Sequence, residues 1–82
     1  MNNTLQSTAI NQTVLVFKTS VKKLEEINIL KSCLNELTHN GRWNFDLEDC
    51  DNILKVVSNK NLKSKIISAL TVNGFYCEEL ND

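Results

Sequence analysis

The residues that most readily bind a soft metal ion or act as nucleophiles are the three cysteines, Cys33, Cys50 and Cys77, and the single histidine, His39. An odd number of widely spaced cysteines without a CxxC pair does not form a disulfide framework. It predicts reduced thiols, as in the cytoplasm. Two thiolates that converge can bind a soft cation such as Cu(I) or Zn(II). Cys50 and Cys77 are weak candidates for such a site, and we expect no metal there.

The same residues do not form a set that is typical of an enzyme. Cys33 borders an apolar helix face and is predicted to be a small core residue. His39 falls at the end of a predicted helix, where an imidazolium is favoured, and is expected far from Cys50. Glycine occurs only at positions 41 and 74, so the sequence has no phosphate-binding loop. We therefore predict a non-catalytic protein without a cofactor.

Two lysines and two aspartates form a possible charge cluster at one end of the domain. Lys22 and Lys23 fall in the first turn of a predicted helix, where positive charge is unfavourable by about 0.3–1 kcal/mol each. They could form an anion site with the free helix amides. We favour surface ion pairs with Asp49 and Asp51, which the expected fold brings to the same end.

The composition is that of one small globular domain. The chain has 82 residues, of which 41% are hydrophobic and 23% are charged, and at this length a single compact core is the limit. There are 9 basic and 10 acidic residues, for a net charge of -1, which argues against a nucleic-acid-binding protein. No apolar run approaches the roughly 18–20 residues of a membrane span, and residues 1–12 lack the features of a secretory signal.

Hydrophobic periodicity predicts six elements in the order strand, helix, strand, strand, helix, strand. The predicted strands are residues 13–19, 42–49, 53–58 and 76–80. A first helix is expected over residues 21–38, with Ser20 as its N-cap and a positive φ angle at Gly41 after its end. A second helix, capped by Asn59 or Asn61, ends at Asn73-Gly74. Residues 49–52 are predicted to form a tight turn, residues 1–12 a loose tail and residues 13–82 a single domain.

This order of elements predicts an α+β protein with the ferredoxin-like arrangement. Right-handed crossovers place four antiparallel strands in the spatial order 4-1-3-2, with both helices on one face. The first and third strands are then central, as their continuous apolarity favours. In the second strand, Trp43, Phe45 and Leu47 alternate with polar residues, and we expect Trp43 to anchor the edge of the core.

Within this order, the chain resembles the heavy-metal-associated domain of small copper chaperones. The resemblance covers residues 13–80 and includes the leucines at 30, 34 and 37 before the Gly41 turn. It also includes the junction Val72-Asn73-Gly74-Phe75-Tyr76 before the last strand. The family binds a soft metal through a CxxC pair after its first strand. The corresponding places fall near Lys23 and Glu26, so the resemblance implies the fold but not the metal site.

The sheet face away from the helices is the strongest functional candidate in the sequence. If Leu15 and Phe17 face the helices, the neighbouring strand residues face outward. The outward set comprises four apolar residues and four charged ones: Val14, Val16, Ile53, Val57, Lys18, Asp46, Glu48 and Lys55. A partly apolar face with a charged rim suits a protein partner or a homodimer. The alternative is a modest exposed patch, or one that the N-terminal tail covers.

These observations favour non-catalytic binding through the open sheet face or the loop end. One alternative is a soft-metal protein that uses Cys50 and Cys77. Another is a module of the same fold class that senses a small molecule. An RNA-recognition motif shares the topology, but its third strand carries aromatic residues on the open face, whereas residues 53–57 are Ile-Leu-Lys-Val-Val.

Overall fold

A computed structural model describes residues 12–58 and 61–80 of the chain. The predicted tail therefore lies outside the described residues except for Gln12. Six elements follow in the predicted order: β1 (Thr13–Thr19), α2 (Leu24–Leu37), β2 (Arg42–Asp46), β3 (Ile53–Ser58), α3 (Lys63–Val72) and β4 (Cys77–Glu79). No helix in these two ranges is long and apolar enough to cross a bilayer.

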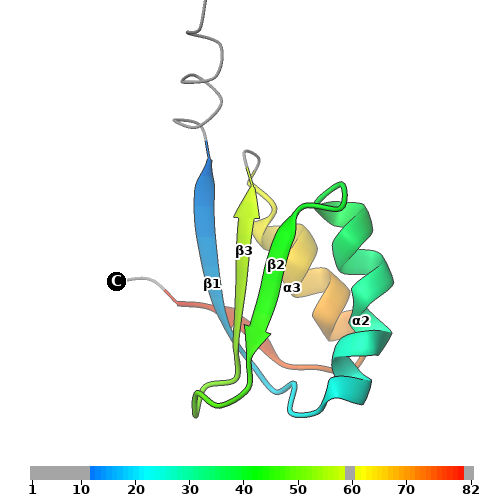
Figure 1. Ribbon diagram of the computed structural model, residues 1–82, viewed down its shortest axis with the longest axis vertical. Helices are drawn as coiled ribbons and strands as arrows, with labels where there is room; N and C mark the ends of the chain where they lie inside the picture. Colours follow the sequence, from blue (N-terminus) through cyan, green and yellow to red (C-terminus); the bar gives the residue numbers. More distant parts are fainter. Residues whose placement is uncertain (1–11, 59–60, 81–82) are drawn as a thin grey trace, which may run out of the picture.

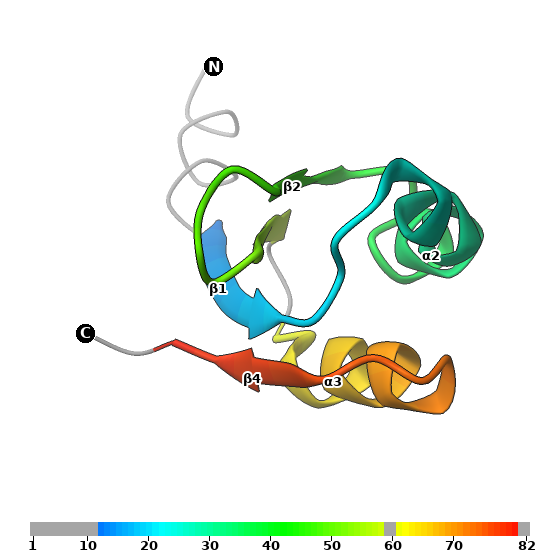
Figure 2. The same ribbon diagram turned by 90° about the horizontal axis from the view of Figure 1, so that it is seen from below.

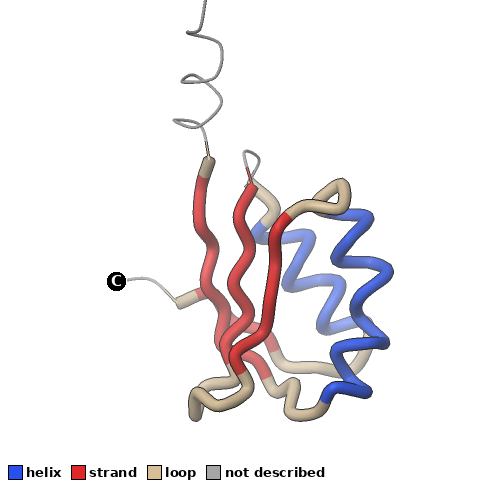
Figure 3. The backbone as a smooth tube through the Cα atoms, in the orientation of Figure 1, coloured by secondary structure: helices blue, strands red, loops and turns tan. Residues whose placement is uncertain are grey.

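The four strands form one antiparallel sheet in the order β2-β3-β1-β4. This order is the predicted 4-1-3-2 read from the other edge, so the ferredoxin-like fold is confirmed. Strands β1, β3 and β2 run side by side in Figures 1 and 3, and Figure 2 shows both helices on the same side of the sheet. None of the described elements covers the other side of the sheet, which we call the open face.

The core lies between the sheet and the helices, and every element except the two edge strands contributes fully buried side chains. Alternation along β1 sends Leu15 and Phe17 inward, where they are 7% and 0% exposed, and leaves Val14 55% exposed. The core residues are Leu15, Phe17, Val21, Leu30, Leu34, Leu54, Val56, Leu62, Ile66 and Leu70. Trp43 packs against the edge of this cluster as predicted, and its Nε1 donates to Asn35 Oδ1 at 2.8 Å.

Helix α2 begins three residues later than predicted. Val21 is fully buried, so the chain runs inward before it turns into the helix. Ser20 does not cap it, because its Oγ accepts a hydrogen bond from the Tyr76 amide at 2.8 Å. The capping group is Glu26, whose Oε1 accepts the amides of Lys22 and Lys23 at 2.7 and 3.3 Å.

The connection from α2 to β2 also differs from the prediction. The left-handed residues are His39 (φ 57°) and Asn40 (φ 59°), and Gly41 does not have a positive φ angle. Glycine is needed at position 41 for space, since a Cβ atom there would lie 2.6 Å from the Thr38 carbonyl oxygen. The end of α3 is as predicted, because Gly74 has φ 93° and the Phe75 amide donates to the Leu70 carbonyl at 2.9 Å.

The remaining boundaries shift by a few residues. Strand β2 ends at Asp46, because the Asp46 carboxylate accepts the Glu48 amide at 3.2 Å and starts the turn early. Before α3, Asn61 Oδ1 accepts the Lys63 amide at 3.2 Å, although the N-cap itself is Leu62. Asn59, the other predicted cap, lies outside the described residues.

Candidate functional site

The open face carries the side chains that point away from the helices. The strand register aligns them in rows across the sheet. One row is Arg42, Val57 and Val14; the next is Asn44, Lys55 and Val16; the third is Asp46, Ile53, Lys18 and Glu78. All predicted open-face residues therefore lie on this face except Glu48, which is exposed in the turn after β2.

Two hollows indent the open face on either side of Asn44 and Lys55. The turn-side hollow has a volume of about 560 Å³ and is lined by Val16, Asn44, Phe45, Asp46, Asp49, Ile53 and Lys55. The loop-side hollow has a volume of about 390 Å³ and is lined by Gly41, Arg42, Trp43, Asn44, Lys55 and Val57. Aliphatic residues of the central strands contribute to both linings, Val16 and Ile53 to the first and Val57 to the second, together with charged residues.

Most charged side chains around these hollows form no ion pair with another described residue. Over the described ranges, Asp46, Asp49 and Lys55 form no ion pair within 4 Å. Lys18 Nζ lies 3.8 Å from Asp51 Oδ1, and both side chains are close to half exposed, so this pair is worth little. The open face therefore offers both signs of charge to a partner.

At the edge of this face, Tyr76 and Glu78 form a hydrogen-bonded pair. The Tyr76 hydroxyl donates to Glu78 Oε1. This hydrogen bond to a carboxylate raises the pKa of Tyr76 above its usual value, with burial and the charge of Glu78 adding to it. The phenol is thus held protonated beside the row that contains Lys18 and Glu78.

The predicted ion pairs at the loop end are not formed. Asp51 contacts Lys18, and within the described part of the chain no ion pair involves Lys22 or Lys23. The lysines are exposed, and their backbone amides already bind Glu26. An anion at these two amides would have to compete with that carboxylate.

Thr19 joins the end of β1 to the turn between β2 and β3. Its side chain is buried, with 4% exposed. Its hydroxyl donates to the Asn52 carbonyl at 2.7 Å and accepts the Val21 amide at 3.1 Å. The Thr19 amide also donates to the Asp51 carbonyl at 3.1 Å. These bonds fix the turn that carries Asp49 against the end of the central strand.

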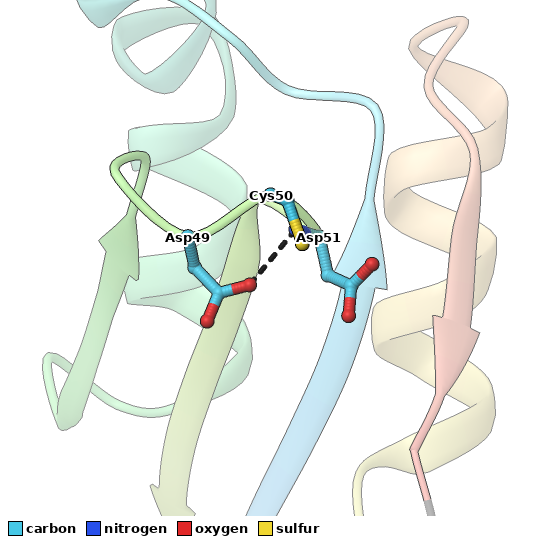
Figure 4. A group of neighbouring side chains, drawn as sticks. All are labelled: Asp49, Cys50 and Asp51. Atoms are coloured by element: carbon cyan, nitrogen blue, oxygen red, sulfur yellow. Dashed lines mark hydrogen bonds between the residues drawn. The ribbon is translucent and has the colours of Figure 1, made fainter.

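The structure does not bring Cys77 together with the candidate ligands around Cys50. The ligand atoms of Asp49, Cys50 and Asp51 lie within 4.8 Å of one another in the turn (Figure 4). Asp49 Oδ1 also accepts the Asp51 amide at 2.8 Å, the dashed line in that view. Cys77 lies on β4 opposite Thr19. Burial raises the pKa of its thiol to about 11, so it is a poor source of thiolate at neutral pH.

Lys23 and Glu26, near which the resemblance would put the CxxC motif, do not fit a soft cation. Lys23 offers an ammonium group, and Glu26 offers a hard carboxylate that caps α2. Soft cations select thiolates. We therefore derive no metal chemistry at the start of α2.

Two side-chain environments were not predicted from the sequence. A groove of about 640 Å³ lies between the helices, with Cys33, Leu37, Ala69 and Val72 among its lining residues. The sequence feature that could have indicated this groove is Val72, an aliphatic residue of α3 that does not belong to the side facing the core. Val72 is 81% exposed. The contact between Asn35 and Trp43 had no such signal, because asparagine on a helix is usually a solvated residue.

Comparison with known proteins adds no relative to this description. No protein-family model matches the chain, and no curated protein or solved structure is significantly similar to it. The resemblance to the heavy-metal-associated domain therefore stays a prediction that depends on the order of elements and the junction at residues 72–76.

Proposed function

We propose that this chain is a small non-catalytic binding domain whose open sheet face binds a partner protein. The observation that carries the proposal is the aliphatic strip along β1 and β3, with charged side chains beside it that form no strong ion pair with any described residue. Within this strip, Val14 is 55% exposed. Interfaces commonly combine an apolar centre with a polar rim.

The turn-side hollow suggests which partner groups would fit. Val16 and Ile53 offer an apolar floor, and Asp46 and Asp49 offer carboxylates at one side. An aliphatic or aromatic side chain would cover the floor, and a neighbouring lysine or arginine would meet the carboxylates. Such charge complementarity supplies specificity and orientation more than affinity.

The arrangement of the reactive residues supports binding rather than catalysis. His39 precedes β2 and Cys50 follows it, so the two side chains start from opposite ends of that strand. Nucleophilic catalysis needs such groups within hydrogen-bond reach of each other. The three free cysteines support a location in the reducing cytoplasm.

A displayed library of random peptides tests the proposal. Peptides selected on the wild-type protein should combine apolar and basic residues, and Val16→Lys should weaken their binding by about 10-fold or more because it places a charge on the apolar floor. Ile29→Lys is the matched control, since Ile29 is an aliphatic residue of α2 that is 58% exposed. Equal losses of peptide affinity in both variants would contradict the proposal. So would an NMR titration in which a selected peptide shifts only backbone amide signals of the helices.

Binding of a cation at the turn is a second candidate, because three ligand atoms of Asp49, Cys50 and Asp51 lie within 4.8 Å of one another. One thiolate with two carboxylates suits Zn(II) better than Cu(I). A calorimetric titration of the reduced protein with Zn(II) should show a single site that Cys50→Ser removes and Cys77→Ser retains. Loss of the site in Cys77→Ser would instead support the pair of cysteines.

A further inference from the structure

Strand β2 leaves one side of its backbone without a partner strand. It is the outermost strand of the sheet and pairs only with β3 over the residues that the structure describes. Figures 1 and 3 show it at the edge of the sheet. Its five residues, Arg42–Asp46, contain no proline and pair with β3 in an unbroken register. An edge of this kind is a template for another strand.

The hydrogen-bond pattern shows which groups of β2 point outward. The amide of Leu80 donates to the Val16 carbonyl, and that of Ser20 donates to the Tyr76 carbonyl. The backbone N–H and C=O groups of even-numbered residues of β1 therefore point towards β4, and those of odd-numbered residues point towards β3. Alternation along antiparallel strands carries this pattern across the sheet. With the observed register, the backbone groups of odd-numbered residues of β3 point towards β2. The N–H and C=O groups of Trp43 and Phe45 then point away from β3, towards the free edge of the sheet.

These outward groups match those of a second copy in the antiparallel direction. If a two-fold axis passes beside Asn44, Trp43 of one copy lies opposite Phe45 of the other. The outward N–H and C=O groups of both residues then pair, as in a hydrogen-bonded pair of an antiparallel ladder. The two Asn44 residues face each other as a non-hydrogen-bonded pair, with Cα atoms about 4.5 Å apart.

The charges along β2 are complementary in this same register. Arg42 of each copy lies opposite Asp46 of the other, on the open face, and opposite charges directly across a ladder are stabilising. Over the described residues, neither side chain forms an ion pair within its own copy. Arg42 donates to the neutral Gln12 side chain at 3.0 Å, where both residues are exposed, and Asp46 accepts the Glu48 amide.

The other face of β2 adds apolar contacts at the same axis. Trp43 and Phe45 form an edge-to-face pair with ring centroids 6.1 Å apart, and both are only partly buried. In the two-fold arrangement the aromatic pair of one copy lies opposite that of the other. Aromatic cross-strand pairs are among those that stabilise a sheet.

We propose that this chain forms a two-fold symmetric dimer in which β2 pairs antiparallel with β2 of a second copy. The four strands of each copy then form one continuous sheet, and the two open faces lie side by side. The inference uses the edge of the sheet and does not depend on what binds the open face. A contact made by short edge strands is small, so we expect a reversible dimer rather than an obligate one.

Charge reversal tests the register of this dimer. Arg42→Asp and Asp46→Arg each place like charges opposite one another and should raise the dimer dissociation constant by about 10-fold or more in sedimentation velocity. The double variant restores opposite charges and should recover the wild-type constant. An equimolar mixture of the two single variants should form a heterodimer, since every facing pair is then complementary. Formation of that heterodimer also shows that both single variants are folded.

Three results would overturn the proposal. A wild-type protein that stays monomeric at protein concentrations up to about 1 mM would exclude even a weak dimer. A wild-type dimer that both single variants retain would place the contact elsewhere. A dimer that Val16→Lys abolishes while Asp46→Arg leaves intact would show association through the open face instead. Loss of peptide binding in Val16→Lys with an unchanged dimer would uphold both proposals separately.

Discussion

Replacing Thr19 by valine tests how the end of β1 holds the turn that carries Asp49. The valine keeps the branched shape and removes the hydroxyl. This leaves the Val21 amide and the Asn52 carbonyl without the partners that now lie at 3.1 and 2.7 Å. The site is buried, so water cannot fully replace the lost bonds. We expect a large loss of stability for a substitution so close in shape.

The magnitude follows from the two orphaned groups. Each buried donor or acceptor left without a partner costs about 1–3 kcal/mol. Asn52 is half-buried and can recover part of its loss by hydration, so we expect a total of about 2–4 kcal/mol for Thr19→Val. Thr19→Ser keeps the hydroxyl and removes one methyl group, at a cost of about 0.8 kcal/mol. For a domain of this size, 1 kcal/mol shifts Tm by about 4–8 °C.

Urea unfolding, followed by circular dichroism and by Trp43 fluorescence, measures both variants. The midpoint should fall much further for Thr19→Val than for Thr19→Ser, with the denaturant slope unchanged. If the two variants lost the same free energy of unfolding to within about 0.5 kcal/mol, the hydroxyl would not be the group that holds the turn.

Three other predictions concern titration and backbone conformation. Burial raises the pKa of Cys77 to about 11 from 9.0, so the stability linked to its thiol is complete below pH 9 and is lost as pH rises towards 11. Urea unfolding at a series of pH values should show that the free energy of unfolding falls more steeply with rising pH for wild type than for Cys77→Ala. Parallel pH dependences of the two proteins would count against this. Glu78→Gln should lower the raised pKa of Tyr76 in an ultraviolet titration, which an unchanged curve would contradict. His39→Gly should stabilise the fold by about 0.5–1 kcal/mol, because φ is 57° there; a lower urea midpoint would refute this.

Local pattern was sufficient to predict the sheet and its strand order. The alternation of apolar and polar residues that begins after Arg42 predicted β2, and Phe45 on its apolar side pairs with the buried Leu54. The continuous apolarity of residues 13–19 correctly indicated a central strand. These signals succeed because a strand with one face in the core cannot slip by one residue without exposing its apolar side chains.

Predictions that depended on one side chain's choice of partner were less reliable. Ser20 was a reasonable N-cap by residue type, but the Tyr76 amide, distant in sequence, takes its hydroxyl. Lys18, which lies in β1 four residues before Lys22, contacts Asp51 instead of the two expected lysines. Several partners lie within reach of each polar group, and their small differences in free energy depend on tertiary geometry that periodicity does not contain.

The position of β1 also has a consequence during synthesis. This first strand is completed early, yet its neighbours in the sheet are β3 and β4, both of which are made later. A nascent chain that ends before residue 53 therefore has no partner strand for Phe17 and Leu15, whose side chains are buried in the finished protein. Such an exposed apolar segment is prone to aggregate or to recruit a chaperone. The release of residues 53–58 from the ribosome is the earliest point at which β1 can pair with a neighbouring strand, and its other side stays unpaired until β4 follows.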